Sequence, residues 1–167
     1  MALTLDATVG GSTSNAYLSV ARSNVLAESL PHLNDWLIDP SINKPQLLIH
    51  ATRLIDRHFV PMGRKANSSQ ALWWPQAGIY YDCTVISISP GVIPEFVEMA
   101  CLEWGWSLHE NPDSESDAFI GLTSLDTPSF NMEFTGSETP VVPKVVSMLL
   151  SPYTMRKPKP FVMLIRT

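Results

Sequence analysis

Residues 43–75, NKPQLLIHATRLIDRHFVPMGRKANSSQALWWP, predict a helix followed by a long loop that ends in two adjacent tryptophans. Asn43 is a favourable N-cap, and Pro45 fits the first helical turn. Apolar side chains then recur at helical spacing until Pro61 and Gly63 end the helix. The predicted buried face comprises Leu47, Ala51, Leu54, Ile55, His58 and Phe59.

The end of this loop has two interpretations. Trp73, Trp74 and Pro75 are expected to anchor the loop to the core, because each indole ring can bury a large apolar area. Alternatively, the basic pair Arg64 and Lys65 could act with the tryptophans as a platform on which the bases of single-stranded DNA stack. Adjacent tryptophans before a proline more often anchor a loop, so core anchoring is the preferred interpretation.

Helices are also predicted on both sides of this unit. A first helix begins after the N-cap Ser19 and runs to about Leu30, with Val20, Val25 and Leu26 on its buried side. A loop follows, with Trp36, Leu37 and Ile38 packed inward. A further helix is predicted after Ile93-Pro94, because apolar residues recur there at helical spacing and form one apolar face. That face comprises Val97, Ala100, Cys101, Trp104 and Leu108.

The C-terminal third is more varied. Residues 118–136 predict a β-hairpin insertion, because apolar and polar residues alternate from Phe130 to Thr135. A short helix is predicted from Val141 to Leu150. The fold is therefore expected to be mainly α, a small bundle of about four helices with a short β-hairpin and an extended C-terminal arm. Residues 1–155 would form one domain and residues 156–167 the arm.

The arm follows a stiff Lys-Pro-Lys-Pro spacer at residues 157–160. Its residues could form a last strand that pairs with residues 130–135 of the same chain, or they could reach a sheet edge or groove on a partner. The spacer favours the partner. The predicted partner-binding residues are Phe161, Val162, Met163, Leu164, Ile165 and Arg166.

The charge balance argues against DNA binding. The chain has a net charge of −5 with 11 Lys and Arg residues, whereas sequence-independent nucleic-acid binding rests on basic residues that displace phosphate counterions. A local basic patch remains compatible with this balance. Charged residues make up 16% of the chain, below the ~25% of typical domains, which favours a surface partly covered by other subunits. No membrane span or signal peptide is indicated.

No catalytic, cofactor or metal site is predicted. His50 and His58 lie eight residues apart, too far for one metal ion at helical spacing. The glycine-rich segment 10–14 lacks the lysine of a phosphate loop and is expected to be a flexible lead-in. We therefore expect that the protein is not an enzyme.

Taken together, the order and spacing of several short motifs resemble a family of tailed-phage head–tail connectors, some members of which carry a DnaT-like single-stranded DNA-binding label. The resemblance spans nearly the whole chain. It rests on Asn15–Ser19, Ala51–Asp56, Gly63-Arg64, Gln70–Pro75, Ile93-Pro94, and Val145–Leu150 before Pro152-Tyr153.

The resemblance implies a structural head-to-tail adaptor that docks beneath the portal protein and binds a tail or neck protein. It further implies a twelve-copy ring at the neck of the virion, made in the host cytoplasm. Genome DNA would pass through the ring without specific binding. The alternative function is that of a DnaT-like single-stranded DNA-binding protein.

Overall fold

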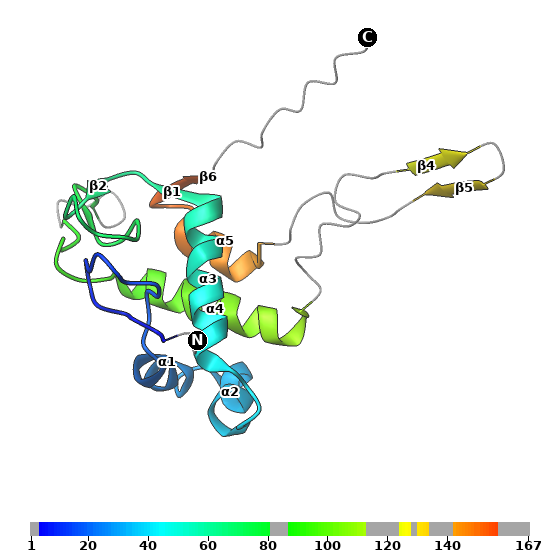
Figure 1. Ribbon diagram of the computed structural model, residues 1–167, viewed down its shortest axis with the longest axis horizontal. Coiled ribbons are helices and arrows are strands. Elements are labelled where there is room, and N and C mark those ends of the chain that lie inside the picture. The colour runs from blue at the N-terminus through cyan, green and yellow to red at the C-terminus, as the bar shows by residue number, and fades with distance from the viewer. Residues whose placement is uncertain (1–3, 81–86, 113–123, 128–129, 134–141, 157–167) are drawn as a thin grey trace, which may run out of the picture.

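A computed structural model describes residues 4–80, 87–112, 124–127, 130–133 and 142–156 of the chain. This part is mainly helical, as predicted, and α3 and α4 lie at its centre (Figure 1). Its α-helices are α1 (Val20–Ala27), α2 (Asn34–Ile38), α3 (Lys44–His58), α4 (Glu95–Glu110) and α5 (Lys144–Leu150), and a short 3-10 helix covers Pro31–Leu33.

The strands form three antiparallel pairs within the described residues. They are β1 (Phe59–Pro61) with β6 (Thr154–Arg156), β2 (Arg64–Lys65) with β3 (Gln76–Ala77), and β4 (Ser124–Thr127) with β5 (Phe130–Glu133). The β4–β5 pair, in which Leu125 lies opposite Met132, confirms the predicted hairpin strands. Residues 157–167, which include the predicted arm residues Phe161–Arg166, lie outside the described part of the chain.

The core forms where α4 packs against α3 on one side and α5 on the other. Leu48 and Ile55 of α3, Val97 and Leu102 of α4, and Leu150 of α5 are all buried. Because each helix turns one apolar stripe toward its neighbours, these side chains are removed from water, which stabilises the fold. None of the described helices combines the length and the hydrophobicity needed to span a membrane.

Two helix starts are confirmed by their capping bonds. The Ser19 hydroxyl accepts a hydrogen bond from the Arg22 backbone N–H, and the Asn43 side-chain oxygen accepts one from the Gln46 N–H. Each cap satisfies one of the backbone donors that a helix leaves open at its N-terminus.

The prediction for residues 20–43 was wrong in part. α1 ends at Ala27, and its Val25 is 55% exposed rather than buried. The predicted loop contains α2, whose Trp36 is buried and donates its indole N–H to the Ser23 hydroxyl at 3.4 Å. Ile38 is 67% exposed, because a helix of five residues can turn only one face toward the core.

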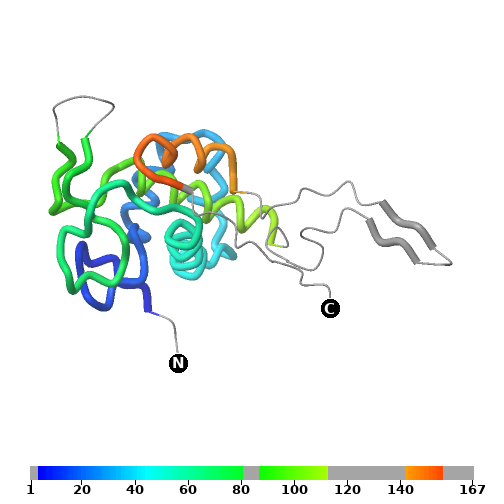
Figure 2. Tube along the Cα trace, turned by 90° about the horizontal axis from the view of Figure 1, so that it is seen from above, coloured from blue at the N-terminus to red at the C-terminus, as the bar shows by residue number. Residues whose placement is uncertain are grey.

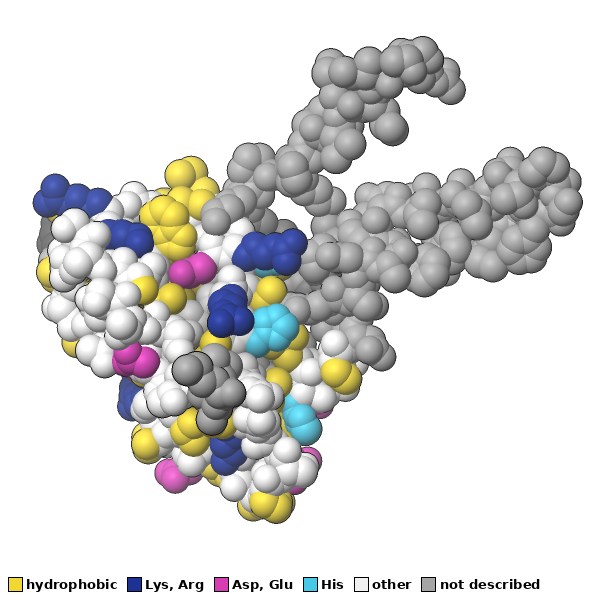
Figure 3. All heavy atoms as spheres, in the orientation of Figure 1, with side chains coloured by type: hydrophobic (Ala, Val, Ile, Leu, Met, Phe, Trp, Pro, Cys, Tyr) yellow, Lys and Arg dark blue, Asp and Glu magenta, His cyan; other side chains and the backbone are white. Residues whose placement is uncertain are grey.

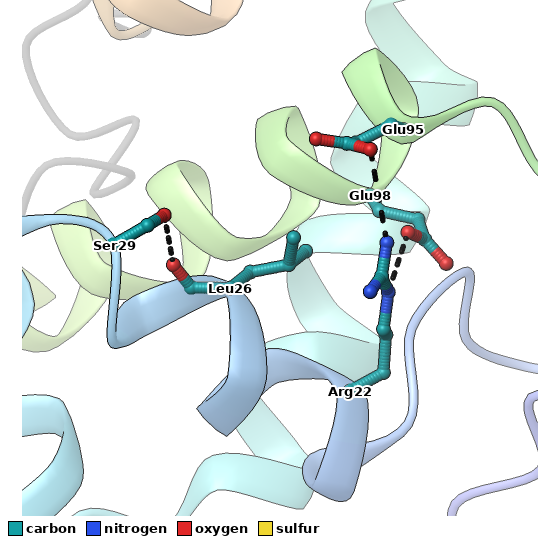
Figure 4. Close-up of polar contacts among 5 residues, drawn as sticks. All are labelled: Arg22, Leu26, Ser29, Glu95 and Glu98. Atoms are coloured by element: carbon teal, nitrogen blue, oxygen red, sulfur yellow. Dashed lines mark hydrogen bonds and ion pairs between the residues drawn. The ribbon is translucent and has the colours of Figure 1, made fainter.

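α1 is fastened to α4 by charged side chains (Figure 4). Arg22 Nε donates to Glu98 Oε2 at 3.0 Å, and Arg22 Nη2 lies 3.9 Å from Glu95 Oε2. Burial raises the pKa of Glu98, and the hydrogen bond from Arg22 opposes that rise. The charge of Arg22 is therefore paired with carboxylates of the same chain.

The N-terminal segment is held in place rather than being a free lead-in. The Asn15 side chain accepts from the Asp6 N–H at 2.8 Å and donates to the Thr4 carbonyl at 2.9 Å. The Ala71 N–H donates to the Gly11 carbonyl at 3.0 Å. Figure 2 accordingly shows this segment in blue beside the loop that follows β2.

Candidate nucleic-acid interface

The loop between β2 and β3 is folded around one buried side chain, that of Gln70. Its Nε2 lies 2.9, 3.1 and 3.0 Å from the carbonyl oxygens of Leu72, Trp73 and Pro75, to which it donates. Its Oε1 accepts from the Asn67 N–H at 2.9 Å. A single amide thus satisfies backbone groups on both arms of the loop and fixes its shape.

The two tryptophans of this loop have different surroundings. Trp74 is 1% exposed and makes an edge-to-face contact with Phe96 of α4, with the ring centroids 5.5 Å apart. Trp73 is only half-buried. The peptide bond between Trp74 and Pro75 is cis. Trp74 and Pro75 therefore lie in the protein interior, whereas part of the Trp73 ring reaches the surface.

Hydrogen bonds hold this end of the loop against α3 and the N-terminal segment. The Trp73 N–H donates to Asp56 Oδ2 at 3.3 Å, and the Trp74 N–H donates to the Tyr17 hydroxyl at 3.3 Å. The Tyr17 hydroxyl in turn donates to Asp56 Oδ1. Burial raises the pKa of Tyr17 well above its usual value, and the Asp56 carboxylate raises it further, so the phenol remains a donor.

Of the two basic residues predicted for this loop, Lys65 lies beside Trp73. Lys65 Nζ is 5.2 Å from the centroid of a Trp73 ring and donates to the Gln70 carbonyl at 3.1 Å. Arg64 is exposed, and no acidic side chain among the described residues forms an ion pair with it. The structure thus places the Lys65 cation at the Trp73 ring, with the exposed Arg64 next to Lys65 in β2. Cations and aromatic faces are the groups that bind phosphates and bases.

Charge is unevenly distributed along the chain. Residues 44–77 contain five of its 11 Lys and Arg residues and only one of its 16 acidic residues, Asp56. Figure 3 shows Lys and Arg side chains over α3 and over the region of β2 on the same face. A chain that is acidic as a whole therefore has a basic face at this loop, a distribution that net charge does not reveal.

The remaining candidate residues do not form a site. Among the described residues, no group of His, Cys, Asp and Glu side chains is arranged to hold a metal ion. Cys101 is buried against Thr52, and burial raises the pKa of its thiol to about 12, so it is not a reactive thiolate. Cys101 is therefore a core residue, as predicted from its position on the apolar face of its helix.

Residues 1–167 match the model of a protein family described as "Putative DnaT-like ssDNA binding protein". No curated protein and no solved structure matches the chain.

This match corrects the identification of the chain as a tailed-phage head–tail connector, because no connector family is found. The predictions that followed from that identification were also wrong. They are the adaptor function, the portal and neck partners, the twelve-copy ring and the passage of DNA without specific binding. The virion location depended on the same resemblance and stays an untested prediction.

The physical reason lies in the motifs that suggested the connector. Many of their residues, among them Tyr17, Leu54, Ile55, Trp74 and Leu150, are buried in the core. Such residues specify how helices pack and carry no information about what the surface binds.

Proposed function

Because the chain belongs to the DnaT-like family, we propose that it binds single-stranded DNA at the loop formed by Arg64, Lys65 and Trp73. Arg64 and Lys65 would neutralise backbone phosphates, and the exposed part of the Trp73 ring would stack on a base. We also propose that the protein binds DNA without a catalytic activity of its own.

The observation that carries this proposal is the position of Lys65 at Trp73, next to the exposed Arg64. The Lys65 ammonium lies 5.2 Å from the Trp73 ring centroid, so the attraction between cation and ring holds both side chains in place. The Gln70 hydrogen bonds fix the loop beneath them. A preformed basic and aromatic surface loses little conformational entropy when a strand binds.

Trp73 also favours single strands over duplex. A base can stack on an indole only when that base is unpaired and accessible. A DNA duplex would offer its phosphates to the two basic residues and would leave the ring unused. Preference for single strands is therefore a direct consequence of the proposed contact.

The first test is fluorescence anisotropy with a labelled single-stranded oligonucleotide and with its duplex. Trp73→Ala is expected to lower the affinity for the single strand about 5- to 150-fold, which corresponds to ~1–3 kcal/mol for one stacked base. Trp73→Phe is the matched control, because it keeps an aromatic face and should retain most of the affinity.

Arg64→Gln tests the phosphate contact in the same assay. It should reduce the slope of log K against log salt concentration by about 0.7, the value for one phosphate contact on a single strand. Lys144→Gln, on the exposed surface of α5, removes one positive charge elsewhere and should leave the slope unchanged. Wild-type protein that binds single strands no more tightly than duplex, with no effect of Trp73→Ala, would overturn the proposal.

A further inference from the structure

We propose that a DNA strand bound at the Trp73 loop continues along the outward face of α3, with its phosphates on Arg53 and Arg57. This inference rests on the proposed function and extends it, because it assigns a path and two further contact residues. We refer to Arg53 and Arg57 as the α3 arginine pair.

The α3 arginine pair is exposed and correctly spaced. Residues four apart lie on one face of a helix, about 6 Å apart along its axis. Within the described part of the chain, no acidic side chain forms an ion pair with either arginine. Two cations one turn apart, neither of them ion-paired to a described residue, form a row that suits the repeating charges of a phosphate backbone.

A hydrogen bond connects this row to the Trp73 loop. Asp56 lies on α3 between the two arginines in sequence, and its carboxylate accepts from the Trp73 backbone N–H at 3.3 Å. The backbone of Trp73 is therefore bound to the stretch of α3 that carries the two arginines. The negative charge of Asp56 faces the Trp73 N–H and the Tyr17 hydroxyl, which both donate to it.

Not every basic side chain of the described residues is available to DNA. Arg22 is paired with Glu95 and Glu98. In residues 44–77, three arginines form no ion pair with a described residue: the α3 arginine pair and Arg64. Figure 3 shows basic side chains over α3 and the region of β2 on one face.

Most acidic residues of α4 are already paired, and α3 has a single one. On α4, Glu95, Glu98 and Glu103 all pair with side chains of the N-terminal third of the chain. Asp35 lies on α2. On α3 itself the only acidic residue is Asp56. Ion pairing therefore weakens the repulsion of phosphate by α4, while the arginines of α3 attract phosphate.

The test measures the salt dependence of binding to a long and a short single-stranded oligonucleotide. The double variant R53Q/R57Q is expected to reduce the slope of log K against log salt concentration by about 1.4, two phosphate contacts at about 0.7 each. The reduction should appear with the long oligonucleotide and be smaller with one too short to leave the Trp73 loop. K144Q is the control for loss of an exposed positive charge. Because Arg57 lies in the last turn of α3, where a cation favours the helix, thermal unfolding is measured for each variant.

The outcomes separate the inference from the proposed function. If R53Q/R57Q matches K144Q while Trp73→Ala still weakens binding, the strand does not follow α3, and the loop alone binds it. If the double variant unfolds early, the single variant R53Q, in the middle of the helix, gives the slope instead, with an expected reduction of about 0.7. If the wild-type protein does not bind single strands, both proposals fail.

Discussion

Gln70 is the residue on which the shape of the candidate interface most depends. It is 4% exposed, and its amide bonds the backbone at four positions between Asn67 and Pro75. Gln70→Ala would remove a partner from each of these groups, although the Trp73 carbonyl would still accept from Gln76 and the Pro75 carbonyl from the Ala66 N–H. Since a buried polar group left unsatisfied costs about 1–3 kcal/mol, and water can reach some of them, we expect a loss of roughly 2–4 kcal/mol in the free energy of unfolding.

Urea denaturation measures this loss, and Ser69→Ala is the control because the Ser69 side chain is exposed. Gln70→Ala should also weaken binding of single-stranded DNA, since Trp73 would lose its fixed position. Equal stability of the two variants would show that the loop does not depend on the buried amide.

Trp73 and Trp74 show how far the site could be predicted at the level of single residues. The sequence placed both rings near Arg64 and Lys65 but could not distinguish them. Neighbouring residues on a loop have no helical or strand period from which to infer which one points inward. Nor could it identify Gln70, because a polar residue in a polar loop gives no local sign that it will be buried.

Among the helices, Gly105 in α4 offers a test of how closely α3 and α4 pack. A Cβ atom added there would lie 3.7 Å from the Leu47 carbonyl oxygen, an ordinary van der Waals distance. Alanine favours a helix interior over glycine by ~0.5–1 kcal/mol. Gly105→Ala is therefore expected to raise the free energy of unfolding by up to about 1 kcal/mol.

Gly63→Ala provides the contrast in the same measurement of thermal unfolding. Its added Cβ would lie 2.6 Å from the Ala77 carbonyl oxygen and 2.7 Å from Ile79 Cγ1, so β2 and β3 would have to separate. This variant should be destabilised. A loss of stability in Gly105→Ala would mean that α3 and α4 tolerate no added atom at their contact.

The elements that could be predicted are those with local signals. Ser19 and Asn43 marked the starts of α1 and α3, because an N-cap acts on the residues directly after it. The β1–β6 pair could not be predicted, since Phe59 and Arg156 are far apart in the chain and the strands have three residues each. α2 was missed because five residues do not show a helical period.

At the scale of the whole molecule, net charge is a poor guide to how charge is distributed over the surface. The overall charge of −5 led to the expectation that DNA would be repelled. Lys and Arg side chains lie over α3 and the region of β2 on one face (Figure 3), while α4 carries Glu95, Glu98, Glu103 and Glu110. A total over the chain contains no information about this separation, which only the arrangement of helices creates.

Tyr17 connects three parts of the molecule, so its ionisation should affect global stability. Its backbone N–H donates to Thr52 Oγ1 at 3.1 Å, and its hydroxyl joins Asp56 of α3 to Trp74 of the loop. The pKa of Tyr17 is raised well above 10.0 by burial first and by Asp56 second. The folded protein therefore keeps the phenolic proton at a pH where the unfolded chain loses it.

The sign of the pH dependence follows from that difference. Above pH ~10 the unfolded state binds fewer protons than the folded state, so stability falls as the pH rises. The contribution of Tyr17 is complete below pH ~10 and is lost as the pH rises from there toward the pKa of the folded state. Tyr17→Phe cannot ionise, but it loses the hydrogen bonds of the hydroxyl and should be less stable at pH 7 by about 1–3 kcal/mol.

Urea denaturation of both proteins from pH 7 to about pH 11 measures the effect. The stability of the wild-type protein should fall more steeply above pH ~10 than that of Tyr17→Phe, so the two curves converge. Lysines and the other tyrosines ionise in both proteins and contribute equally to both slopes. Curves that stay parallel over the whole range would show that Tyr17 ionises equally easily in the folded and unfolded states. The Tyr17 hydroxyl would then not be the buried link between the N-terminal segment, α3 and the Trp73 loop.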